Sequence, residues 1–118
     1  MKMRLLLLLC GLWEAGVCAQ PYPSKTIRLI VSVQPGGNLD LMGRAVADKV
    51  SEGIGQRMIV ENRPGANSTI GLSAMVRSAP DGYTLAMVAQ SALVAPKMMK
   101  TPPFDPTRDF AEIGRAHV

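Results

Sequence analysis

Two glycine-containing segments, Pro35–Asp40 and Arg63–Thr69, have residue types and spacing that could do chemistry. Each follows an apolar stretch typical of a β-strand and leads into a helical pattern. Glycine lets backbone N–H groups approach a ligand closely. The unpaired amides of a helix's first turn point at that ligand with the positive end of the helix dipole. Two such loops side by side predict a site for a small carboxylate.

The first loop offers both backbone and side-chain donors. Gly36 and Gly37 can present their amides to a carboxylate, and Asn38 can donate its side-chain amide or cap the helix. Asp40, in the first helical turn, suits the dipole and can hold the loop by accepting backbone hydrogen bonds. The alternative is that this loop is only a tight turn followed by an N-cap, since short glycine motifs have many false positives.

The second and third loops offer hydroxyls. Ser68 and Thr69 carry hydroxyls and amides, Asn67 tolerates a left-handed backbone, and Ser91 follows the third apolar stretch. Taken singly, helix capping or a helix start is the simpler explanation of these residues. The candidate ligand-binding residues are Gly36, Gly37, Asn38, Asp40, Asn67, Ser68, Thr69 and Ser91.

The charges of the chain indicate neither a nucleic-acid-binding surface nor a cationic side chain dedicated to binding a carboxylate. From Gln20 to Ala111 there are ten Lys/Arg and seven Asp/Glu, a net charge of +3, and the basic residues are scattered. Arg63 could clamp a carboxylate, but it could equally pair with Glu61 or Asp81, and we favour that structural role. No nucleic-acid partner is expected.

No catalytic or cofactor-binding pattern is present in the sequence. The single histidine, His117, lies in the last seven residues, which are predicted to be a non-native tail. Neither paired carboxylates nor metal-ligand spacing is found. The loops lack the spacing of dinucleotide-binding and P-loop motifs. Cys10 and Cys18 both fall in a predicted leader, which leaves no thiol for disulfides or metals. We therefore expect no enzyme activity, no metal and no cofactor.

The two ends of the chain are predicted to stand apart from the domain. Basic Lys2 and Arg4, an apolar run and a small-residue site ending at Ala19 predict a secretory signal peptide over residues 1–19. At the other end, the codons GAG ATC GGA AGA GCA CAC GTC would encode Glu112–Val118 and coincide with a common sequencing-adapter read. We therefore expect residues 112–118 to be a non-native tail and residues 20–111 to be the domain; a genuine short tail is the alternative.

Alternating strand and helix patterns fill the domain. We expect strands over Thr26–Val33, Arg57–Glu61 and Tyr83–Val88, and helices over Leu39–Ile54 and Thr69–Ser78, followed by a proline-rich segment of loop or irregular helix. The first helix places Met42, Val46, Val50 and Ile54 on one apolar face. Because crossovers are right-handed, this βαβαβ order predicts an α/β fold: a parallel sheet with helices on both faces. All three loops after the strands should meet at its carboxyl edge.

Four linked motifs resemble one family. Tyr22–Val31 with Pro35–Asp40, Val60–Ala66 with Ile70-Gly71, Asp81–Leu85, and Phe104–Pro106 with Asp109-Phe110 match Bug-type periplasmic receptors of tripartite tricarboxylate transporters. The resemblance implies a periplasmic-binding-protein type II fold with two lobes. It further implies a small organic acid bound between the lobes, delivery to a membrane permease, and a periplasmic monomer. The candidate residues fall at the family's carboxylate loops.

The chain also departs from that family. Ser32 and Gln34 replace the usual proline and apolar or proline positions of the first loop, and Val94–Pro96 departs from a familiar Ile-Asn-Pro. Such receptors are about twice the size of one domain. We therefore expect only the first part of lobe one, as a fragment unable to bind alone. Two alternatives remain: a fragment of an exported enzyme whose catalytic residues lie elsewhere, and a short non-binding interaction module.

Overall fold

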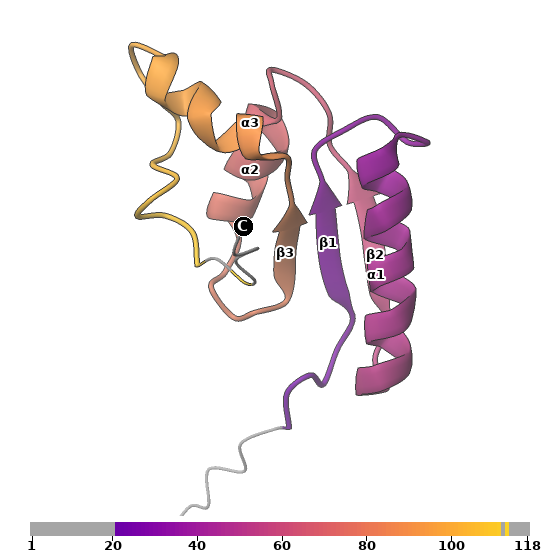
Figure 1. The fold of residues 1–118 in the computed structure, drawn as a ribbon. Helices are drawn as coiled ribbons and strands as arrows, with labels where there is room; N and C mark the ends of the chain where they lie inside the picture. The colour runs from indigo at the N-terminus through magenta and orange to yellow at the C-terminus, as the bar shows by residue number, and fades with distance from the viewer. Residues whose placement is uncertain (1–20, 112, 114–118) are drawn as a thin grey trace, which may run out of the picture.

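A computed structural model describes residues 21–111 and 113, which form one three-stranded parallel sheet with flanking helices (Figure 1). The elements in chain order are β1 (Ile27–Val31), α1 (Asn38–Ile54), β2 (Met58–Asn62), α2 (Thr69–Val76), β3 (Thr84–Met87), α3 (Gln90–Val94) and the 3₁₀ helix η1 (Ala95–Met98). The strand order is β2-β1-β3, and both neighbours of β1 run parallel to it. The predicted α/β class and element order are confirmed, with boundaries shifted by one or a few residues.

The helices lie on both faces of the sheet, as predicted. On one face α1 packs on β1 and β2, where Leu29, Val31 and Ala47 form a buried cluster. On the other face α2 packs on β1 and β3, and Leu72 forms a second cluster with Ala92 and Phe104. Each helix thus covers the central strand and one neighbour.

The predicted inner face of α1 is wrong. Met42 is 59% exposed, and Val46 and Ile54 are also exposed, whereas Asp40, Gly43 and Ala47 are buried against the sheet. A Cβ on Gly43 would lie 2.9 Å from Val31 Cγ2. The helix therefore approaches β1 through its smallest residues, and this close approach turns the larger apolar stripe outward.

The strand β2 is only partly buried. Its apolar run suggests a strand covered on both faces, yet Ile59 is exposed. The reason is its position at one side of the described sheet, where α2 covers β1 and β3 instead.

The predicted leader lies outside the described residues, as does the predicted tail apart from Ile113. Among the described residues, none of the helices combines the length and apolar character needed to span a bilayer.

Candidate functional site

The loops that follow the three strands lie at one edge of the sheet, drawn at the top of Figure 1. The chain passes from β1 to β2 on one side and then crosses to β3 on the other. In such sheets ligands bind beyond the carboxyl ends of the strands, where the order reverses. The first two loops are in contact here, because the Ser68 hydroxyl donates to the Ser32 carbonyl at 3.3 Å.

The Asp40 carboxylate organises the first loop. It is buried and accepts hydrogen bonds from the Gly36 amide at 2.9 Å, Arg44 Nε at 3.1 Å and Asn62 Nδ2 at 2.8 Å. These donors, the Gly36 amide first, lower the pKa of Asp40 from 3.8 to about 2. Asp40 thus holds the loop by accepting a backbone hydrogen bond, which is one of the roles predicted for it. Both of its carboxylate oxygens accept hydrogen bonds from within the protein.

The remaining first-loop residues are exposed at the edge of the sheet. Gly36 has a φ of 88°, which only glycine adopts easily, and this turn brings its amide to Asp40. Gly37, not Asn38, is the N-cap of α1, and no side chain caps the helix. The alternative prediction of Asn38 as N-cap is therefore wrong, because the helix begins one residue earlier than its apolar pattern indicates. The amides of Gly37, Asn38 and Leu39 stand at the start of α1, where helical geometry leaves them without an intrahelical partner.

The second loop has an unusual backbone. Ala66, Asn67 and Ser68 all have positive φ values, of 45°, 51° and 69°, which is uncommon for non-glycine residues. Ser68 is the N-cap of α2 by position but makes no side-chain capping bond. Thr69 is buried, and its Oγ1 has no hydrogen-bond partner. Side-chain capping, the simpler explanation of these two residues, is therefore wrong.

The third loop contributes less. Ser91 is the second residue of the short helix α3, is exposed, and follows the N-cap Ala89. The helix start is the role that the structure gives it.

Three polar residues at this edge were not predicted as site residues. Arg44 and Asn62 complete the Asp40 network, and Asn62 also donates to the Val33 carbonyl. The Arg44 contact has a sequence signal, its spacing of four from Asp40 on a helix. Asn62 has none, because its partner lies 22 residues away. Ser32, buried at the end of β1, is the third.

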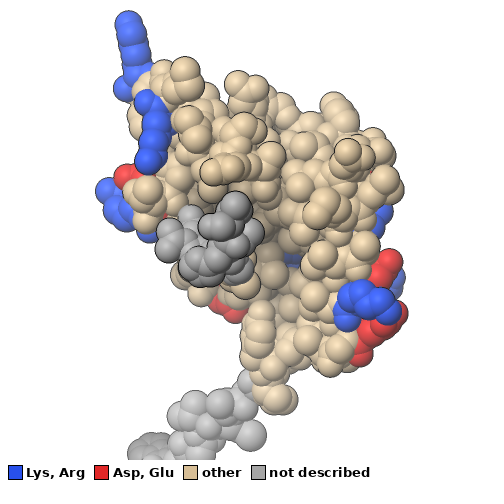
Figure 2. All heavy atoms as spheres, viewed as in Figure 1, with Lys and Arg blue, Asp and Glu red and all other residues tan. Residues whose placement is uncertain are grey.

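Cationic side chains near the second loop are engaged in ion pairs. Arg63 Nε donates to Glu61, whose other oxygen accepts from Arg28. Glu61 therefore has a lowered pKa, chiefly through Arg63. This is the structural role that we favoured for Arg63. In Figure 2 the visible surface at the top of the sheet, over the ends of β1 and β2, is formed by uncharged residues.

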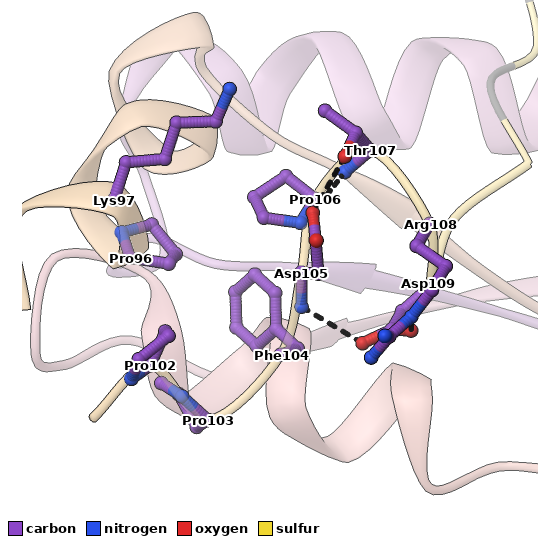
Figure 3. A pocket seen from close by; sticks show the side chains of 10 residues that line it. All are labelled: Pro96, Lys97, Pro102, Pro103, Phe104, Asp105, Pro106, Thr107, Arg108 and Asp109. Carbon is purple, nitrogen blue, oxygen red and sulfur yellow. Dashed lines mark hydrogen bonds and ion pairs between the residues drawn. The ribbon is translucent and has the colours of Figure 1, made fainter.

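A separate hollow of about 540 Å³ is lined by none of the candidate residues, and Figure 3 shows the side chains that line it. Prolines, Phe104 and the segment up to Asp109 line it. Its carboxylates are engaged locally: Asp105 accepts from the Thr107 amide and hydroxyl, and Asp109 accepts from the Asp105 amide. We therefore place the candidate site at the loop edge, where donors are available. Within the described residues no group of His, Cys, Asp and Glu side chains is arranged to hold a metal ion.

Comparison with known proteins gives a consistent result. Residues 42–117 match the family described as "Tripartite tricarboxylate transporter family receptor". A UPF0065 protein of Bordetella bronchiseptica is 43% identical over 96 residues, which cover 80% of this chain and 29% of that protein. The periplasmic binding protein BugD superposes with a TM-score of 0.71 at 31% identity, over 75% of this chain and 30% of its own. MatC from Rhodopseudomonas palustris with bound malate gives 0.68 at 27% identity, over 75% and 31%.

These matches identify the family and show how much of its members' length this chain covers. The chain spans less than a third of each of these relatives. The family match continues to residue 117, so the non-native tail stays a prediction. The chain belongs to the receptor family of the tripartite tricarboxylate transporters.

Proposed function

We propose that this chain is the first part of an exported receptor that binds a small carboxylate or dicarboxylate at the loop edge. The observation that carries the proposal is the Asp40 network. It uses the Asp40 carboxylate and Arg44 to hold the Gly36 turn, and so leaves the start of the 17-residue helix α1 open to a ligand.

The chemistry of that edge suits an anion. The first amides of α1 lack intrahelical partners, whereas the Thr69 amide that begins α2 donates to the Ala66 carbonyl at 3.0 Å. The dipoles of both helices favour negative charge at these ends. The donors are neutral groups, so desolvating them costs less than desolvating a buried cation. The malate bound to MatC supports a small dicarboxylate as the class of ligand.

Transport is the role that the family supports. The predicted leader would export the chain to the periplasm, where a completed receptor would pass its ligand to a tripartite-type permease. We propose a monomer without catalytic activity. Against the exported-enzyme alternative, the Asp40 carboxylate is engaged within the protein, and the described residues of this edge include no histidine or cysteine. The interaction-module alternative gives no reason for the Asp40 network.

The test uses a completed receptor. Residues 22–111 replace the matching segment of the Bordetella bronchiseptica relative, and calorimetry measures binding of malate, succinate and a neutral diol of similar size. We expect saturable binding of the acids alone, and none by the fragment without the added sequence. Binding of the diol equal to that of malate, or no acid binding by a folded completed receptor, would refute the proposal.

The predicted tail has its own test. Amplifying the locus from genomic DNA and sequencing across the codon for Ala111 should show a frame that continues past it. Codons for Glu112–Val118 followed by a stop would contradict the predicted tail.

A further inference from the structure

The Ser32 hydroxyl is buried and has no partner. The residue is 3% exposed, and its Oγ makes no hydrogen bond within the structure. Thr69, 8% exposed, has the same property at its Oγ1. Among the described residues, these are the only buried side-chain polar atoms left unpaired. Because native proteins pair nearly all such groups, two unpaired hydroxyls near one helix end require an explanation.

Both hydroxyls belong to the place where β1 meets the start of α2. A Cβ on Gly71, in the first turn of α2, would lie 3.2 Å from the Ser32 Cβ. Thr69 is the first residue of that helix, and the Ser68 hydroxyl donates to the Ser32 carbonyl. Ser32 is therefore packed directly against the N-terminus of an eight-residue helix.

The surroundings define the chemistry of the missing partner. The first turn of a helix presents N–H donors and positive potential, so a group that completes this cluster must accept hydrogen bonds and gains from negative charge. A hydroxyl donates readily to a carboxylate, and such charge-assisted bonds are stronger than neutral ones. A carboxylate oxygen meets each of these requirements.

We propose that Ser32 Oγ donates a hydrogen bond to the carboxylate of the bound ligand at the start of α2. This inference rests on the proposed function and adds a ligand contact that the family resemblance does not supply, because the usual residue at this position is a proline without a hydroxyl. Because Ser32 Oγ is enclosed in the structure, this contact requires that Ser68 moves aside when the ligand binds. The contact that holds Ser68 there, at 3.3 Å, is long for a bond between hydroxyl and carbonyl.

The first experiment compares Ser32→Ala with unmodified protein in the completed receptor described above. Loss of one hydrogen bond to a charged ligand should weaken malate binding about tenfold. Ser78→Ala is the matched control, since Ser78 donates to the Ala74 carbonyl beyond the opposite end of α2. It should leave malate affinity unchanged. Equal affinity for the Ser32→Ala variant and unmodified receptor would overturn the inference while leaving the proposed function intact. No malate binding by the unmodified, folded receptor would overturn both.

The second experiment needs no ligand and uses the full chain, secreted through its own leader. Removing an unpartnered hydroxyl should leave the unfolding midpoint of the Ser32→Ala variant unchanged or raised, whereas Ser78→Ala should lower it. A lowered midpoint for Ser32→Ala would mean that its hydroxyl is already paired, through a water molecule for example. That result would overturn the inference even if the completed receptor failed to fold.

Discussion

Replacing Gly71 by alanine should destabilise the protein at the point where α2 meets the first loop. The added Cβ would lie 2.9 Å from the Arg63 carbonyl oxygen, 3.2 Å from Ser32 Cβ and 3.4 Å from Ile30 Cγ2. Real Cβ atoms do not approach within 3.0 Å, and the closest of these atoms belongs to the backbone, which cannot rotate away. Helix α2 must therefore move off the sheet.

The size of the effect is a balance of two terms. Overpacking a tight site costs about 1–3 kcal/mol, and replacing glycine by alanine inside a helix returns up to about 1 kcal/mol. With the full return subtracted, the net expectation is a loss of up to about 2 kcal/mol of unfolding free energy, and a loss of about 1–3 kcal/mol relative to a glycine-to-alanine change at an open helix position. For a domain of this size, each kcal/mol corresponds to about 4–8 °C in the thermal midpoint.

The assay is thermal and urea unfolding of the purified full chain, followed by circular dichroism at the helical band. Gly53→Ala is the control, because a Cβ at Gly53 in α1 meets nothing within 4 Å. That variant should gain up to about 1 kcal/mol from helix propensity alone. If Gly71→Ala proved as stable as Gly53→Ala, α2 would not be held against the Arg63 carbonyl, and the packing argument would fail.

Three further predictions test the core, the Asp40 network and the surface charges. Leu72→Ala, at a side chain 1% exposed, should cost about 2–5 kcal/mol in urea unfolding. Ile70→Ala, which shortens a side chain that is 53% exposed, should change the unfolding free energy by no more than about 0.5 kcal/mol. Similar losses for the two variants would contradict the assignment of buried and exposed faces of α2. The lowered pKa of Asp40 stabilises the fold above pH 3.8, and this contribution is lost as pH falls from 3.8 through about 2. Asp40→Asn should make the acid-side decline in thermal midpoint shallower, because other carboxylates with lowered pKa values, such as Glu61, keep contributing to it. Parallel pH profiles for the variant and unmodified chain would argue against the network. Glu61→Gln should cost less than about 1 kcal/mol, because the ion pairs with its two arginine partners are partly exposed. That loss should shrink in added salt, and an effect independent of salt would point to another cause.

Local patterns in the sequence determined the order of elements, the edge at which the loops gather, and the family. Strand and helix periods depend on residues close in the chain, and parallel strands with right-handed crossovers leave one arrangement of loop edges. The position of Asp40 in a first helical turn indicated that it could hold the loop by accepting backbone hydrogen bonds, and in the structure it accepts one from the Gly36 amide. These are short-range statements, and the structure bears them out.

The tertiary structure decided which residues are neighbours across the sheet. The apolar stripe of α1 predicted Met42 inside, yet the close approach to Val31 selects Gly43, since only a residue without a side chain fits there. Asn62 became an Asp40 partner because β2 lies beside β1, and the Ser32 hydroxyl lost water because α2 packs over the end of its strand. Such contacts depend on strand order and helix position, which bring together residues far apart in the chain. The local periodicity of the sequence therefore cannot predict these contacts.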